Sequence, residues 1–140
     1  MKLYLDTSSL LKLYVQEYGS DEVRQDLAEA TTAATSAVTY AEARAAFARR
    51  RREGTITAAA FSVIKQDFES DWPGFVIIEP TMALCRTAGE LAERYRLRSL
   101  DSIHLATFLQ VAHEGAPSET RLSTFDRELS RAALAAVRRL

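Results

Sequence analysis

The sequence is poor in the residues that build disulfides and thiolate metal sites. It contains one cysteine, Cys85, and two histidines, His104 and His113. A single cysteine cannot form an internal disulfide, and nothing around it resembles a metal-binding or redox motif. We therefore interpret Cys85 as a small buried apolar residue. The cytoplasm is the compartment that such a chain suits.

Glycine and long apolar runs are also scarce. The five glycines are Gly19, Gly54, Gly74, Gly89 and Gly115. They form neither a G-x-G-x-x-G motif nor a Walker loop, which argues against a nucleotide-binding module. Every apolar run falls well short of the ~20 residues that a membrane-spanning helix needs. Residues Met1–Asp6 reach an acid without the apolar stretch of a signal peptide, so we expect no membrane contact.

Neither sign of charge dominates the chain. The net charge is −1, so no overall field marks a nucleic-acid binder and any basic surface must be local. Hydrophobic residues make up 47% and charged residues 26%, a balance typical of a soluble globular domain. No repeat, low-complexity segment or linker divides the chain, so we expect residues 1–140 to form a single domain.

Short apolar segments alternate with helical patterns along the whole sequence. Strands are predicted at residues 2–5, 31–36, 75–78 and 120–124. Helices are predicted at residues 10–15 with an end near Gly19, and at 20–30, 38–53, 55–71, 80–96, 99–114 and 127–140. This alternation is typical of the α/β class, with helices packed around a mainly parallel sheet.

Four carboxylates stand at the edges of segments that should be buried. Asp6 and Asp126 follow the first and last strands, whereas Glu42 and Asp101 lie near the starts of helices. Ligands of parallel sheets bind beyond the carboxyl ends of the strands, so we expect the four side chains to meet at one edge. Taken singly, each also has a simpler interpretation: the aspartates as helix N-terminal acids and Glu42 as an exposed helix residue.

Carboxylates gathered in one pocket must either hold protons or bind a cation. A like-charge pair ~4 Å apart costs about 4 kcal/mol at an effective dielectric of ~20. Oxygen ligands without a Cys or His cluster favour Mg²⁺ or Mn²⁺. A carboxylate-bound metal ion can activate water and stabilise charge on a phosphate, so the pattern favours hydrolysis of a phosphodiester.

Around these acids the chain resembles the PIN-domain ribonucleases, and in particular the VapC toxins of toxin–antitoxin pairs. The matching segments are Leu3–Tyr14 (LYLDTSSLLKLY), Ser36–Glu42 (SAVTYAE), Leu97–Ala106 (LRSLDSIHLA) and Ser123–Leu129 (STFDREL). The resemblance implies a three-layer α/β/α fold with a short central sheet. It also implies a Mg²⁺- or Mn²⁺-dependent endoribonuclease that acts as a homodimer on an RNA substrate and is silenced by a VapB-type antitoxin.

The same resemblance implies roles for particular residues. Asp6, Glu42 and Asp101 match the metal-binding acids of the family most firmly, and Asp126 matches a fourth acid that often acts through water. Thr124 looks like a supporting hydroxyl, and we expect Ser8 and Thr7 to orient Asp6 or cap its helix. The tail, residues 135–140, departs from the family, so we expect the last edge strand to be shortened or missing.

Several other residues have open interpretations. Two basic clusters, Arg49–Arg52 and Arg94–Arg98, either grip RNA phosphates or form solvated helix ends. His104 is either a general base or, by our preference, a packing residue. Tyr14, Tyr18, Tyr40 and Trp72 either stack on bases or pack in the core. Leu10, Leu11 and Tyr14 are candidates for an antitoxin groove.

Other function classes fit less well. A haloacid-dehalogenase phosphatase needs Asp-x-Asp after its first strand, and a receiver domain needs an adjacent acid pair, but this chain has Asp6-Thr7-Ser8. Two alternatives within the same fold stay open: a PIN nuclease of RNA processing that is not a toxin, and a PIN-like scaffold without catalysis. The sequence does not say which RNA is cleaved.

Overall fold

Strand β1 (Lys2–Leu5) lies inside a four-stranded sheet in which every neighbouring pair is parallel. A computed structural model describes all residues, 1–140. The other strands are β2 (Thr32–Ser36), β3 (Val76–Ile78) and β4 (Thr120–Ser123), in the order β3-β2-β1-β4. Leu5 pairs with Ser123, so β1 and β4 end at the same edge. The predicted α/β class and parallel sheet are confirmed.

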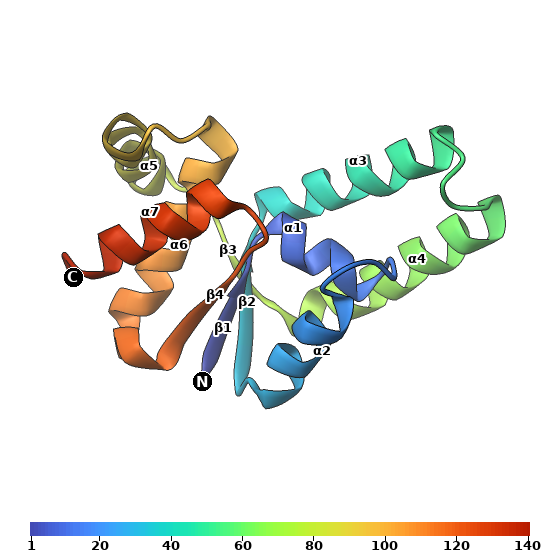
Figure 1. Cartoon of the computed structure of the whole chain (residues 1–140), viewed down its shortest axis with the longest axis horizontal. Coiled ribbons are helices and arrows are strands. Elements are labelled where there is room, and N and C mark those ends of the chain that lie inside the picture. The colour runs from blue at the N-terminus through green and yellow to red at the C-terminus, as the bar shows by residue number, and fades with distance from the viewer.

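The side chains of β1 alternate between two cores. Leu3 and Leu5 face a core with Phe47 and Phe68, whereas Tyr4 faces a core with Phe108; all six are buried. Because successive strand residues point to opposite faces, a fully apolar strand needs helices on both sides. Figure 1 shows α1 to α4 on one side of the strands and α5 to α7 on the other, which gives three layers.

The helices have well-defined bounds. They are α1 (Thr7–Leu10), α2 (Ser20–Glu29), α3 (Val38–Arg52), α4 (Ala58–Asp71), α5 (Met82–Tyr95), α6 (Ser99–Glu114) and α7 (Arg127–Val137). Short 3₁₀ turns add η1 (Leu11–Leu13), η2 (Trp72–Gly74) and η3 (Pro117–Glu119). Threonine side chains cap α4 and α5, where Thr57 and Thr81 accept hydrogen bonds from the amides of Ala60 and Leu84. No helix is long and apolar enough to cross a bilayer.

The first helix is shorter than the sequence predicts. It makes one α turn and one 3₁₀ turn and then stops, although the apolar pattern runs on to Val15. The chain must turn back sharply here, because Gly19 adopts a left-handed conformation (φ 89°) against the ring of Phe125. A Cβ atom on Gly19 would lie 2.5 Å from that ring, so only glycine fits the turn.

Three smaller expectations also need revision. Helix α5 begins at Met82 instead of residue 80, because Thr81 takes the capping position. Cys85 is only half-buried. Leu10 is fully buried in the core, so it cannot line an exposed antitoxin groove.

Most of the candidate base-stacking aromatics are packing residues. The rings of Tyr14, Tyr40 and Trp72 all lie 5.4 to 5.6 Å from the ring of Phe68, at which α3 and α4 meet. Edge-to-face and tilted contacts at this spacing are typical of aromatic cores. These three residues therefore stabilise the hairpin of α3 and α4 that extends from the sheet in Figure 1. Tyr18 is different, since 90% of it is exposed.

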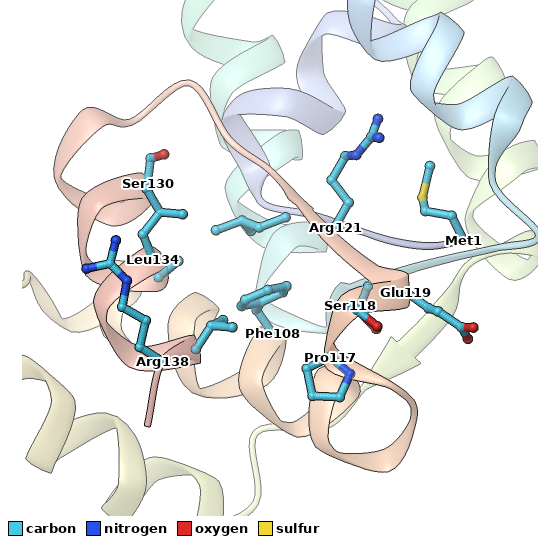
Figure 2. Close-up of a pocket in the computed structure, with 13 residues that line it drawn as sticks. Met1, Phe108, Pro117, Ser118, Glu119, Arg121, Ser130, Leu134 and Arg138 are labelled. Carbon is cyan, nitrogen blue, oxygen red and sulfur yellow. The ribbon is translucent and has the colours of Figure 1, made fainter. Parts of the chain in front are cut away.

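No strand follows α7, so β4 has a free edge, as the divergent tail predicts. A groove of about 470 Å³ lies beside it. Figure 2 shows Phe108 between the α7 residues Leu134 and Arg138 and the β4 residue Arg121. The groove also includes Met1, so it extends to the amino ends of the strands, away from the four acids.

A buried ion pair closes the turn after α1. The Lys12 ammonium donates to Glu17 (3.1 Å) and to the Tyr18 carbonyl oxygen (2.6 Å) and lies over the ring of Phe125. Arg50 donates to the other carboxylate oxygen of Glu17 at 2.7 Å, which joins this turn to α3. Part of the basic run at the end of α3 is therefore engaged in structural ion pairs.

We expect Glu17→Gln to destabilise the protein by about 1–2 kcal/mol at pH 7, because it leaves the Lys12 ammonium buried without its counter-charge. Burial raises the pKa of Glu17, but hydrogen bonds from Arg50 and Lys12 outweigh it, so the pKa lies below its ordinary value. A lowered folded-state pKa stabilises at pH above the unfolded-state value, and the stabilisation is lost as pH falls through the folded-state value. Denaturant unfolding should therefore show the difference at pH 7 and a shrinking one below about pH 4. Glu22→Gln, on an exposed acid without an ion pair, is the control, and an equal loss there would refute this role.

Candidate active site

Asp6 is held rigidly at the carboxyl end of β1. It lies one residue beyond the strand and caps α1, so its Oδ1 accepts hydrogen bonds from the Ser9 amide (3.0 Å) and the Ser8 hydroxyl (2.7 Å). Its Oδ2 accepts from the Thr124 hydroxyl at 2.5 Å. Only 4% of Asp6 is exposed. Three donors on a carboxylate with so little freedom fix the direction of its remaining lone pairs.

Thr124 joins Asp6 to Asp126. Its hydroxyl donates to Asp6 and accepts from the Asp126 amide at 3.1 Å. Asp126 in turn caps α7, because its Oδ1 accepts from the Leu129 amide at 3.0 Å. Two acids 120 positions apart in sequence are therefore tied through one hydroxyl, since β1 and β4 are neighbours.

Glu42 lies in the second turn of α3 and is fixed by two donors. Its Oε1 accepts from the Thr7 hydroxyl at 2.7 Å and from the His104 Nε2 at 2.9 Å. Thr7 directly follows Asp6, so this bond places Glu42 beside Asp6. The sequence predicts that Thr7 orients Asp6 or caps its helix; its hydroxyl instead binds Glu42.

The buried ring of His104 forms hydrogen bonds with both Glu42 and Tyr4. Its Nδ1 lies 2.8 Å from the Tyr4 hydroxyl and its Nε2 faces Glu42, while only 2% of the residue is exposed. Because a carboxylate can only accept, Nε2 carries a proton toward Glu42, and Nδ1 accepts from Tyr4. Both ring nitrogens are thus occupied, which favours the packing interpretation of His104 over a general base.

Asp101 differs from the other acids because no hydrogen bond fixes its carboxylate. It lies in the first turn of α6, half-buried, one turn before His104. Burial raises its pKa, and the negative charges of Asp126 and Asp6 raise that pKa further, although His104 and Arg98 oppose them. The charges of Asp126 and Asp6 act on Asp101 because the fold brings the three aspartates near one another.

The carboxylates of this pocket are not electrostatically equivalent. Burial raises the pKa of Asp6 despite its three hydrogen bonds. Burial also acts to raise the pKa of Glu42, but the hydrogen bonds from His104 and Thr7 outweigh it and the pKa lies below its ordinary value. No three of the acids and histidines converge closely enough to enclose a metal ion as the side chains stand. The site is therefore acidic, and Asp101 is its one carboxylate without a hydrogen-bond donor.

Figure 1 shows how the fold gathers these residues. The starts of α1, α3 and α7 lie beyond the same ends of the strands. This is the crevice in which open parallel sheets bind their ligands. The edge at which the sequence predicts Asp6, Glu42, Asp101 and Asp126 is the edge at which the structure places them.

Comparison with known proteins identifies the family of this chain. The family model for the PIN domain matches residues 3–134. The chain belongs to the PIN-domain family. Among its relatives are ribonuclease VapC45 and ribonuclease VapC49 of two Mycobacterium tuberculosis strains, each 31% identical over 134 residues that cover 96% of this chain and 90% of the relative. Ribonuclease VapC47 of M. tuberculosis is 31% identical over 131 residues, 91% of this chain and 86% of the relative. The resemblance to the VapC group is confirmed.

Solved structures agree on the fold. M. tuberculosis VapC20, a toxin that cleaves the sarcin-ricin loop, superposes with a TM-score of 0.67 over 93% of this chain and 94% of VapC20, at 18% identity. FitAcB of Neisseria gonorrhoeae superposes with a TM-score of 0.65 over 94% of this chain and 92% of its own, also at 18% identity. The three-layer PIN fold expected from the motifs is therefore confirmed.

Proposed function

We propose that this PIN-domain protein is a metal-dependent endoribonuclease that acts as the toxin of a toxin–antitoxin pair. The observation that carries the proposal is the edge of the sheet at which four acids meet: Asp6, Glu42, Asp101 and Asp126. Asp6 and Glu42 are fixed by hydrogen bonds, whereas Asp101 is free to accept them. Carboxylates that hydrogen bonds already hold in place, next to one that is free to bind, can position a substrate and a cation without rearrangement of the protein side chains.

The residues present fit a hard divalent cation. All ligand atoms offered at the pocket are carboxylate oxygens, which Mg²⁺ and Mn²⁺ prefer. Mg²⁺ commonly keeps several waters and needs only one or two protein carboxylates, so three converging ligands are not required. Asp6 and Asp101 would hold the ion, with Glu42 and Asp126 acting on its waters. Once bound, such an ion lowers the pKa of a water molecule and offsets charge on the phosphate.

Each residue of the chain has a distinct task in this proposal. Ser8 and Thr124 hold Asp6, and His104 with Thr7 holds Glu42. Asp101 has no hydrogen-bond donor, so one of its oxygens is free for the ion, while Glu42 and Asp126 orient the attacking water and take up its proton. Hydrolysis forms one P–O bond to the water oxygen and breaks the P–O bond to the leaving nucleotide, whose oxygen takes up a proton.

A VapB-type antitoxin, a homodimer and a cytoplasmic location complete the proposal, and the VapC names of the relatives support the toxin–antitoxin part of it. We expect expression of the chain alone to arrest growth, and the product of a small neighbouring gene to relieve the arrest. Cleavage without arrest would favour a nuclease of RNA processing instead of a toxin.

We expect the purified protein to cleave total cellular RNA with Mg²⁺ or Mn²⁺, and excess EDTA to stop cleavage completely, because the acids alone cannot neutralise the charge on the phosphate. Mapping the 5′ ends of the products by sequencing would identify the target among transfer, ribosomal and messenger RNA. Readdition of Mg²⁺ should restore cleavage. Cleavage that persists in EDTA would refute metal dependence, and a folded protein that cleaves no RNA would favour a non-catalytic scaffold.

A further inference from the structure

The basic side chains of the protein divide into neutralised and free groups. Six of them form ion pairs with acids: Lys12, Arg24, Arg44, Arg49, Arg50 and Arg121. Five arginines near the starts of α6 and α7 form none: Arg94, Arg96, Arg98, Arg127 and Arg131. All five are exposed. These five are among the unpaired basic residues of the chain, and they cluster in sequence around the starts of the helices that carry Asp101 and follow Asp126.

A hollow of about 310 Å³ lies within this surface. Its lining consists of Tyr95, Arg96, Glu128, Arg131, Ala132 and Ala135. One wall is therefore the end of α5, and the other is α7. Two arginines face the same space as an aromatic side chain, a combination suited to the phosphate and base of a nucleotide.

The backbone conformation of Arg96 is unfavourable for a residue with a Cβ atom. It ends α5 in the left-handed conformation (φ 56°, ψ 45°) and is the only residue other than glycine with positive φ. This conformation disfavours any residue with a Cβ atom, and helices that end this way mostly use glycine. Strained residues gather at binding sites, where the surrounding structure compensates for them. The guanidinium group gives a reason for an arginine here.

Both walls of the hollow are close in sequence to residues of the acidic site. Arg98 immediately precedes α6, and its charge acts on Asp101 three residues later. On the other wall, Glu128 and Arg131 follow Asp126 within the first turns of α7. The helices that begin beside Asp101 and Asp126 are therefore flanked by, or form, the walls of the hollow.

We propose that this hollow binds the nucleotide next to the cleaved phosphodiester of a single-stranded RNA. Arg96 and Arg131 bind its phosphate, and Tyr95 contacts its base. Glu128 would repel a bare phosphate but accepts hydrogen bonds from a ribose hydroxyl or a base amine, which favours a whole nucleotide. The inference rests on the proposed nuclease function and assigns part of its substrate binding.

Arg96→Gly separates this role from a structural one, because glycine relieves the left-handed strain while removing the guanidinium group. We expect its thermal midpoint to equal or exceed that of the wild type, and its affinity for RNA to fall about tenfold, or about 1.4 kcal/mol. Binding is measured by fluorescence anisotropy in EDTA with a labelled RNA of about 15 nucleotides, over a range of salt concentrations. Loss of one phosphate contact should reduce the slope of log K against log salt by about 0.7.

Arg131→Ala should weaken binding similarly, and the cleavage kinetics of both variants should show a raised KM with little change in kcat. Arg86→Ala is the matched control, because Arg86 is an exposed, unpaired arginine earlier on α5. Variants that bind RNA like the wild type, or a control that loses as much affinity, would overturn the subsite while leaving the nuclease intact. Unchanged RNA binding with weakened binding of the co-expressed antitoxin would also overturn it and assign the hollow to that protein. A wild type that neither binds nor cleaves RNA would instead remove the proposed function itself.

Discussion

Asp101→Asn is expected to reduce RNA cleavage by about a thousandfold or more and, at the same time, to make the protein more stable. Cleavage falls because the only carboxylate of the pocket without a hydrogen-bond donor loses its charge and an acceptor oxygen. Stability rises because burial and the charges of Asp126 and Asp6 raise the pKa of Asp101 in the folded protein. A raised pKa means that ionisation at neutral pH opposes folding.

The gain in stability of Asp101→Asn should depend on pH. The stabilisation by asparagine should be present at neutral pH, because the raised pKa makes ionisation of Asp101 oppose folding. It should be lost as the pH falls through and well below the unfolded-state pKa of about 4, where the carboxyl is protonated in both states. Thermal unfolding across this pH range measures the effect on stability, and single-turnover cleavage measures the effect on activity.

Asp6→Asn should abolish cleavage without the same gain in stability, because asparagine disturbs three existing hydrogen bonds. Asp67→Asn, on the exposed face of α4, is the control for both measurements. Wild-type cleavage by Asp101→Asn would show that the acidic cluster is not the active site.

His104→Ala is expected to destabilise the protein by about 3 kcal/mol and to slow RNA cleavage by about 10- to 100-fold. The stability loss comes from a cavity in the core and from the Tyr4 hydroxyl, which is left without a partner in a fully buried place. The activity loss comes from Glu42, which loses one of its two donors and can leave its present direction.

A second substitution separates these two consequences. In Tyr4→Phe/His104→Ala the orphaned hydroxyl is gone, so part of the stability should return, whereas Glu42 is still unsupported and the activity should stay low. Chemical denaturation and cleavage rates of both single variants and the double variant complete the cycle. If His104→Ala instead slowed cleavage by about four orders of magnitude and removed one limb of the pH–rate profile, His104 would be a general base.

The sequence alone predicts the sheet and the four acids because both depend on local signals. The apolar run Leu3-Tyr4-Leu5 and the acid that follows it are visible in six residues, and the rule for parallel sheets then gathers the acids at one edge. What could not be predicted depends on contacts between distant residues. The bond between Tyr4 and His104 spans 100 positions, and no pattern near either residue indicates it.

Two further features resist prediction for a similar reason. The apolar pattern favours a continuous first helix, but the packing of Gly19 against Phe125, more than 100 residues away, ends it early. Arg96 has no sequence signal for a left-handed backbone, because that conformation is normally indicated by glycine or asparagine. Local propensity gives way where tertiary packing or a binding site sets the backbone.

The position of β1 between β2 and β4 has a consequence for the moment at which the enzyme becomes active. The hydrogen bond between Thr124 and Asp6 spans 118 positions, and β4 is the last strand to be made. During synthesis β1 and β2 can pair early, but the acidic edge lacks Thr124 and Asp126 until β4 and the start of α7 have been made. A nascent chain that has not yet reached β4 therefore carries an incomplete site. The strand order makes completion of the site depend on the pairing of β4 with β1.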